Sequence, residues 1–253
     1  MKKEQIAVQL YSFRDHIQNI GDIVETFRKL KKTGYDCIEL SPSLTLSAED
    51  TIRILSDEGI RACGSGINSI KAVADPGAAI DHLKKLDCKR AVYAYPHIIP
   101  KNEDELSRFI EELKSFVEIM RKNGIRLNYH NHAIEFIHFR NKSFLDIIYD
   151  EIPGLDAELD LFWIQTGGGS PLSWIKKMKG RMEAIHIKDY GTVDGNQRMM
   201  MPIGMGNLEW DVLIPAAEEA GVKYFVVEHD ADCKDPFESF KISMDYLNEN
   251  FKK

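Results

Sequence analysis

Histidine and carboxylate residues stand at the ends of several short apolar segments of this sequence, where together they could bind a metal ion. The residues are His130, Asp160, His186 and Glu228. Imidazole nitrogens combined with carboxylate oxygens suit manganese, cobalt, zinc or iron better than magnesium or calcium, which favour all-oxygen ligand sets. These residue types therefore predict a divalent metal site, provided that the fold brings the segment ends together.

The elements that would position these residues follow a regular alternation of short apolar and longer amphipathic segments. The apolar segments, expected to be strands, are residues 6–11, 37–40, 60–64, 90–95, 125–131, 156–161, 184–187 and 224–228. The amphipathic segments, expected to be helices, are residues 20–32, 48–58, 76–86, 104–122, 143–149, 171–179, 210–220 and 236–250, and residues 190–207 form a longer loop.

Eight strand–helix repeats without a flexible linker predict an α/β fold, a single (β/α)8 TIM barrel domain spanning residues 1–253. A doubly wound open sheet is the alternative. That fold would normally carry a glycine-rich phosphate loop after its first strand, whereas residues 11–14 read Tyr-Ser-Phe-Arg. The sequence therefore favours the barrel.

The strand alternation indicates which side chains face the barrel axis. The inward set at the strand ends comprises Asn128, His130, His132, Asp160, His186, Lys188 and Glu228. A single inward histidine or aspartate is more often a hydrogen-bonded buried group than a ligand. Several at the C-terminal ends of barrel strands, where barrel enzymes carry their active sites, favour a metal centre.

Composition excludes several other classes. A net charge of −7 without a cluster of basic residues argues against nucleic acid as a partner. No segment approaches the roughly 20 apolar residues of a membrane span. The four cysteines form no CxxC pair. We therefore expect a cytoplasmic protein without a membrane partner; a homo-oligomer is compatible with the sequence.

Five motifs resemble the sugar phosphate isomerase/epimerase proteins of the xylose-isomerase-like barrel superfamily. They are residues 9–14 (QLYSFR), 129–132 (YHNH) with Glu135 and Phe136, 158–160 (ELD), 186–189 (HIKD) and 227–228 (VE). The resemblance spans nearly the whole chain. In that superfamily a metal is held by Glu, Asp, His and Glu at the ends of strands five to eight, which implies Asp160, His186 and Glu228 as ligands here.

Strand five departs from the family pattern, because His130 stands where ketose epimerases carry a glutamate that is both a ligand and an acid/base group. The resemblance leaves the fourth ligand open, and we take His130 for it. His132 or Glu135 would then supply the missing base.

The favoured hypothesis is a sugar isomerase or epimerase that removes a proton next to a carbonyl of a sugar or polyol, with the ion stabilising the enediolate. Glu228 and His132 are the expected acid/base groups. Lys188 is expected to bind or stabilise a substrate oxygen. Expected substrate contacts are Glu39, His97 and Glu135.

Three alternatives remain open at this stage. A lyase or dehydratase would form the same enediolate from a keto-sugar or keto-inositol and then expel a group from the β-carbon. A metal-assisted phosphodiesterase on damaged DNA would need a basic groove, against which the net charge of −7 argues. A carbohydrate sensor without catalytic activity is the third.

Overall fold

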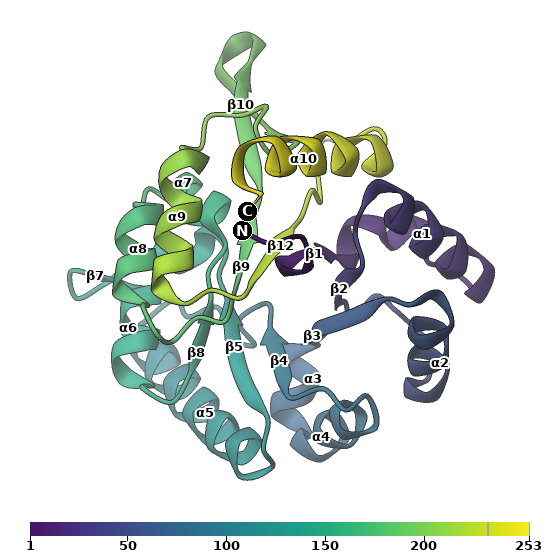
Figure 1. Ribbon diagram of the computed structural model, residues 1–253. Coiled ribbons are helices and arrows are strands. Elements are labelled where there is room, and N and C mark those ends of the chain that lie inside the picture. Colours follow the sequence, from purple (N-terminus) through teal and green to yellow (C-terminus); the bar gives the residue numbers. More distant parts are fainter. Residues whose placement is uncertain (232, 253) are drawn as a thin grey trace.

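Eight parallel strands form a barrel with helices around it (Figure 1) in the computed structural model, which describes residues 1–231 and 233–252. The barrel strands are β1 (Ile6–Gln9), β2 (Cys37–Leu40), β3 (Arg61–Ile67), β4 (Arg90–Tyr93), β5 (Arg126–His130), β8 (Asp156–Glu158), β9 (Ala184–Ile187) and β12 (Tyr224–Val227). Their order in the sheet is β8-β5-β4-β3-β2-β1-β12-β9.

The barrel is nearly closed at the seam between β8 and β9. Two isolated parallel bridges join these strands, Ala157 to Met182 and Asp160 to His186. The backbone N–H of His186 donates to the carbonyl oxygen of Leu159 at 2.8 Å. Two of the candidate ligands therefore face each other across the seam, which fixes their separation through the backbone.

Ten helices surround the strands in the described part of the chain: α1 (Ile20–Thr33), α2 (Ala48–Glu58), α3 (Ser69–Ala74), α4 (Pro76–Lys85), α5 (Glu103–Lys122), α6 (Phe144–Glu151), α7 (Leu161–Thr166), α8 (Pro171–Lys177), α9 (Trp210–Ala220) and α10 (Pro236–Phe251). Local sequence sets their ends. In α1, the Asn19 side chain accepts from the N–H of Asp22, and Gly34 ends the helix at a φ of 112°. None of the described helices has the length and apolar composition that crossing a membrane requires.

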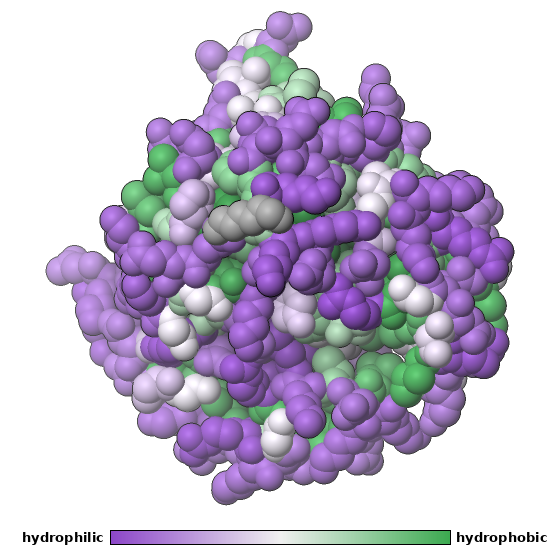
Figure 2. Space-filling model, in the orientation of Figure 1, coloured by the Kyte–Doolittle hydropathy of each residue, from purple (hydrophilic) through white to green (hydrophobic). Residues whose placement is uncertain are grey.

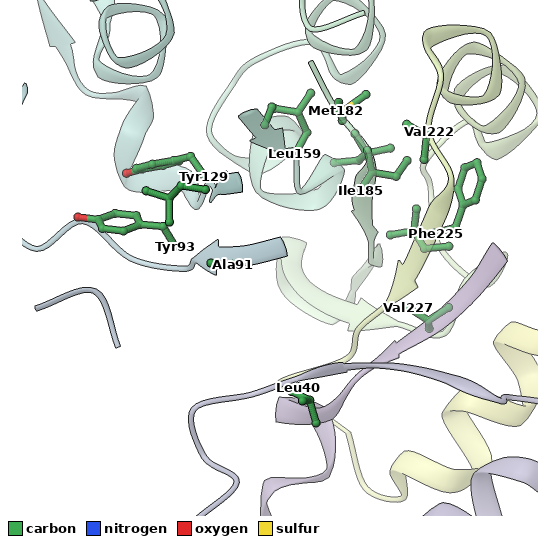
Figure 3. Packing of buried hydrophobic residues seen from close by; sticks show 14 of the residues in the cluster. Leu40, Ala91, Tyr93, Tyr129, Leu159, Met182, Ile185, Val222, Phe225 and Val227 are labelled. Atoms are coloured by element: carbon green, nitrogen blue, oxygen red, sulfur yellow. The ribbon is translucent and has the colours of Figure 1, made fainter. Parts of the chain in front are cut away.

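The main core lies between the strands and the surrounding helices. Figure 3 shows Ile185, Phe225 and Val227 projecting from neighbouring strands into this layer, and all are buried. Tyr93 and Tyr129 stack nearby at 5.3 Å between ring centroids. The face seen in Figure 2 is largely hydrophilic, with scattered apolar patches. Because the outward residues of the strands supply this core, the alternate residues are left to build a polar interior.

The structure differs from the predicted elements at several places, among them a short hairpin of β6 (His138–Phe139) and β7 (Lys142–Ser143) and earlier ends of β1, β4 and β8. Helices α3 and α7 were not predicted, because each has six residues and is too short for a periodic pattern. The predicted strand 60–64 begins at Arg61 and continues to Ile67. The expected loop 190–207 contains a hairpin of β10 (Asp189–Val193) and β11 (Gln197–Met201), which projects from the barrel at the top of Figure 1.

Asp189 anchors the chain that returns from this hairpin. Its buried carboxylate accepts backbone N–H groups from Gly204 at 3.0 Å, Gly206 at 3.2 Å and Leu208 at 3.2 Å. The indole N–H of Trp210 donates to the same carboxylate at 2.7 Å. One side chain thereby satisfies donors spread over the whole return segment.

We expect Asp189→Ala to lower the free energy of unfolding by about 2 kcal/mol, because several buried donors lose their acceptor. Urea unfolding followed by circular dichroism measures this change. Asp194→Ala, in the exposed tip of the same hairpin, is the matched control and should change the stability by less than about 0.5 kcal/mol. Equal stability of the two variants would refute the anchoring role.

Candidate metal centre

Four buried side chains meet at the C-terminal end of the barrel. One nitrogen or carboxylate oxygen from each of His130, Asp160, His186 and Glu228 lies within 4.8 Å of the others. His130 ends β5, His186 lies in β9, Asp160 follows β8 and Glu228 follows β12. The structure thus brings together the residues that the sequence predicts as ligands.

The orientation of the two imidazoles fits a metal site. The Nε2 atom of His186 lies 2.9 Å from Oε1 of Glu39, and its Nδ1 atom lies 2.6 Å from Oε2 of Glu228. A carboxylate that holds one ring nitrogen directs the other toward an ion, as in many metalloproteins. Nδ1 of His130 is buried and has no hydrogen-bond partner among the described residues. Nδ1 of His130 is thus free to bind an ion, whereas Nδ1 of His186 would exchange its contact with Glu228 for one.

The electrostatics of the site favour positive charge at this point. Burial alone would lower the pKa of His186, but Glu39 and Glu228 outweigh it and raise this pKa well above 6.5. Burial raises the pKa of Asp160 to about 6, against the opposing effect of Lys188. Burial also lowers the pKa of His130 well below 6.5, with a smaller contribution from the charge of His186. A neutral His130 keeps a lone pair available for coordination.

Lys188 lies against two of the candidate ligands. Its Nζ atom is 3.2 Å from Oδ2 of Asp160, 3.1 Å from Oε2 of Glu228 and 3.0 Å from Oδ2 of Asp230, and its side chain is 1% exposed. Burial would lower the pKa of Lys188, but these three carboxylates raise it above 10.5. Lys188 is therefore a fixed ammonium group that holds the carboxylates in place.

A second layer of charge lies below the centre. The buried Arg90 forms ion pairs with Glu39 and, at 2.7 Å, with Oε2 of Glu158. Gln9 donates to Oε1 of Glu39 at 2.6 Å. Gly64 leaves space for the guanidinium, since an added Cβ there would lie 2.6 Å from Cζ of Arg90. This layer connects to the metal centre because Glu39 also contacts His186.

A cavity of about 490 Å³, within the range of small-ligand sites, is lined by His130, His186 and Glu228 but not by Asp160. His132 lines it between the rings of Tyr95 and Trp163, at 5.4 Å and 5.5 Å between ring centroids. Burial lowers the pKa of His132 to about 4, and Lys188 adds to this shift. At neutral pH, His132 is therefore an uncharged imidazole beside the candidate metal centre.

Comparison with known families agrees with this geometry. The model of a family described as xylose isomerase-like TIM barrel matches residues 27–250. The chain belongs to the xylose isomerase-like TIM barrel family. This membership confirms both the barrel and the family resemblance predicted from the sequence.

Solved structures with the same xylose isomerase-like fold cover nearly the whole chain. A sugar phosphate isomerase/epimerase from Parabacteroides distasonis is 21% identical, with 98% of this chain and 94% of that chain covered and a TM-score of 0.80. The probable 3-DHS dehydratase AsbF from Bacillus anthracis is 15% identical, with 98% and 99% covered and a TM-score of 0.75. A xylose isomerase-like TIM barrel protein from Mycobacterium smegmatis, in complex with magnesium, is 17% identical, with 98% and 97% covered and a TM-score of 0.76. The comparison with curated proteins finds no match.

Glu39, His97 and Glu135, which the sequence predicts as substrate contacts, lie outside the cavity. Glu39 is fully buried in the layer of Arg90, below the mouth. Glu135 is also fully buried, and accepts from the Tyr129 hydroxyl at 2.9 Å and from the N–H of His132 at 2.7 Å. Neither glutamate lines the cavity, and the third residue, His97, does not line it either.

His97 lies in the loop after β4, beside α5. Its ring stacks on Phe109 of α5 at 5.0 Å between centroids, and its Nε2 atom lies 3.0 Å from Oε2 of Glu112. The Tyr93 hydroxyl bonds to its other ring nitrogen. The loop after β4 turns outward before residue 97, so His97 is directed toward α5.

Arg90 and Asp230 are not among the site residues that the sequence predicts. Arg90 had a usable signal, because strand alternation places it on the same face as Val92, which lines the cavity. Asp230 follows the last strand and had no such signal. It lines the cavity and contacts Lys188 at 3.0 Å.

Proposed function

We propose that this protein is a divalent-metal-dependent isomerase or epimerase of a sugar or polyol, with the ion held by His130, Asp160, His186 and Glu228. The clustering of these donors within 4.8 Å, beside a cavity of about 490 Å³, carries the proposal. The mixed donor set favours manganese, cobalt, zinc or iron over magnesium. A bound ion would act as a Lewis acid on a substrate carbonyl and make the neighbouring C–H more acidic.

Three side chains of the protein would act beside the ion. We assign His132 as the group that takes the proton from carbon, because it is uncharged at neutral pH and lines the cavity. Burial would raise the pKa of Glu228, but Lys188 and His186 lower it to about 2, so Glu228 is ionised and suited to coordination. Lys188 fixes these carboxylates from within the barrel wall.

Return of the proton by His132 to the neighbouring carbon gives isomerisation. Delivery of a solvent proton to the opposite face of the same carbon, with His132 releasing its own proton to solvent, gives epimerisation. Incubation with ketoses, keto-inositols and 3-keto-glycosides in deuterated water containing Mn²⁺ tests the proposal. Deuterium should enter a C–H next to the carbonyl without loss of water or of an aglycone. Absence of exchange with every compound would refute the proposed function.

A lyase or dehydratase is the second candidate, and one observation favours it. The strand-five position at the centre is the imidazole of His130, so Glu228 is the one glutamate among the four clustered donors. A single proton transfer followed by departure of a β-substituent does not need a second glutamate on the other face of the substrate. Release of water or an aglycone in the same incubation would establish this reaction instead.

We expect His132→Gln to slow deuterium exchange about a hundredfold, because the substituted amide cannot accept the proton. Affinity for Mn²⁺ should stay unchanged, since His132 is not one of the four clustered donors. His138→Gln, at an exposed position, is the matched control and should exchange at the wild-type rate. Exchange at the wild-type rate in His132→Gln would remove His132 from the mechanism.

A further inference from the structure

Part of the cavity lining is apolar and unusually exposed. Tyr11, Ile70 and Tyr95 line the cavity and are 43%, 65% and 45% exposed. Pro42 and Ile67 continue the same wall. Large apolar side chains that stay exposed in a concave site indicate a surface that a ligand covers.

No lysine or arginine is among the described residues that line this cavity, whose basic side chains are three histidines at or beside the candidate metal centre. Lys71 lines the neighbouring cavity, and three other nearby cations are bound by groups of the protein. Lys188 is bound to three carboxylates, and Arg90 is bound below the centre. Arg14 donates to the carbonyl oxygens of Tyr11 and Asp230 and lies over the Tyr11 ring.

Outside the candidate metal centre, this lining offers a phosphate group no lysine or arginine partner. Glu228 and Asp230 line the cavity with negative charge, and recognition of phosphate depends on arginine, lysine or free backbone N–H groups. Helix α3 begins beside this wall, and its Lys71 N–H is already bonded to the Asn68 side chain at 3.1 Å. The apolar part of the lining is thus better suited to an unphosphorylated sugar.

Apolar surface also continues beyond the cavity. A neighbouring cavity of about 230 Å³ shares Pro42 and Ile67 with it and extends toward Leu44 and Leu46. The apolar lining therefore continues from Ile67, at the end of β3, into the loop that follows β2.

We propose that the substrate is an unphosphorylated sugar or polyol that carries an apolar substituent of aryl or alkyl type. The oxygen-rich end lies toward His130, His132 and Glu228, and the substituent lies against Tyr11, Ile70 and Tyr95. This inference rests on the proposed function for the orientation of the sugar, and extends it to the class of substrate.

Binding of inert ligands tests the inference separately from catalysis. The probes are the methyl and phenyl pyranosides of glucose, galactose and mannose, and the 6-phosphates of the same three sugars, titrated calorimetrically into the full chain with Mn²⁺. In at least one series the phenyl glycoside should bind about tenfold or more tightly than the methyl glycoside. No 6-phosphate should bind more tightly than the methyl glycoside of its series. Tighter binding of a 6-phosphate, or the lack of a phenyl advantage in every series, overturns the inference.

Two isoleucine-to-serine variants test whether the apolar wall causes the tighter binding of phenyl glycosides. Ile70→Ser, at a position 65% exposed, should reduce the phenyl advantage at least threefold without changing Mn²⁺ affinity. Ile52→Ser, on α2 and 42% exposed, is the same substitution at a residue outside the cavity and should leave the advantage unchanged. Equal behaviour of the two variants would show that the apolar wall is not the binding surface.

Failure of the inference and failure of the proposed function give different results. Deuterium exchange by the wild-type protein with no phenyl advantage rejects the apolar substituent and leaves the isomerase or epimerase proposal intact. A phenyl advantage that Ile70→Ser removes, in a protein that exchanges no deuterium, rejects the proposed reaction while supporting the binding surface.

Discussion

Replacing Asp160 with asparagine is expected to weaken the binding of Mn²⁺ by more than about 100-fold, since changes to the partners of metal ligands alone cost about 10- to 100-fold. The substitution removes one of the two carboxylates in the cluster but nearly preserves its shape. The remaining amide oxygen can still accept from the N–H of Trp163, which the Asp160 carboxylate holds at 2.9 Å. Helix α7 therefore keeps its N-terminal cap. Calorimetric titration with Mn²⁺ measures the loss, and deuterium exchange should fall at least as much.

Asp230→Asn provides a matched control for the charge of Asp160. Both carboxylates contact Nζ of Lys188, at 3.0 Å for Asp230 and 3.2 Å for Asp160, but only Asp160 belongs to the clustered donors. We expect Asp230→Asn to weaken Mn²⁺ binding by less than about tenfold, through the electrostatic field alone. If Asp160→Asn binds Mn²⁺ like the wild type, or if both variants lose equal affinity, Asp160 is not a ligand.

The barrel could be predicted from the sequence because each strand–helix unit carries its own local signals. The helix α1 begins after the capping residue Asn19 and ends at Gly34, and its apolar residues repeat with helical spacing. Helices α3 and α7 have six residues each, fewer than two turns, so no period could be recognised. The β10–β11 hairpin could not be predicted because its strands show little alternation of apolar and polar residues.

The residues of the candidate metal centre could be predicted because they lie at the ends of barrel strands. Parallel strands in a barrel end at one mouth, so the inward residues near His130 and His186 had to converge. Glu39 and His97, the expected substrate contacts, do not line the cavity, for two different reasons. Glu39 lies within β2 rather than after it, which places it in the layer of Arg90. His97 lies in a loop, where strand alternation no longer indicates a direction.

Sequence position alone does not identify the partners of Lys188. Alternation correctly places Lys188 inward, beside His186, but says nothing about its partners. The structure gives it three carboxylates within 3.2 Å and 1% exposure, so its charge balances the ligand set. We therefore expect Lys188 to act on substrate only through Asp160, Glu228 and Asp230.

Replacing Arg90 with methionine is expected to lower the free energy of unfolding by about 3 to 5 kcal/mol, the usual result of removing one partner from a buried ion pair. Arg90 is paired with Glu39 and Glu158, and all three side chains are almost completely buried. Without the guanidinium, both carboxylates would remain in the barrel interior without their main counter-charge. Urea unfolding followed by tryptophan fluorescence measures the difference.

Arg126→Met provides the matched control, because Arg126 is the neighbour of Arg90 in the β4–β5 register and its side chain is 52% exposed. Its ion pairs with Glu183 and, at 3.7 Å, with Asp156 lie near solvent, so the loss should be below about 1 kcal/mol. Combining Arg90→Met with Glu39→Gln and Glu158→Gln should recover part of the stability, since the unpaired charges are then removed as well. Equal losses for Arg90→Met and Arg126→Met, or no recovery in the triple variant, would mean that the charge layer below the metal centre does not stabilise the barrel.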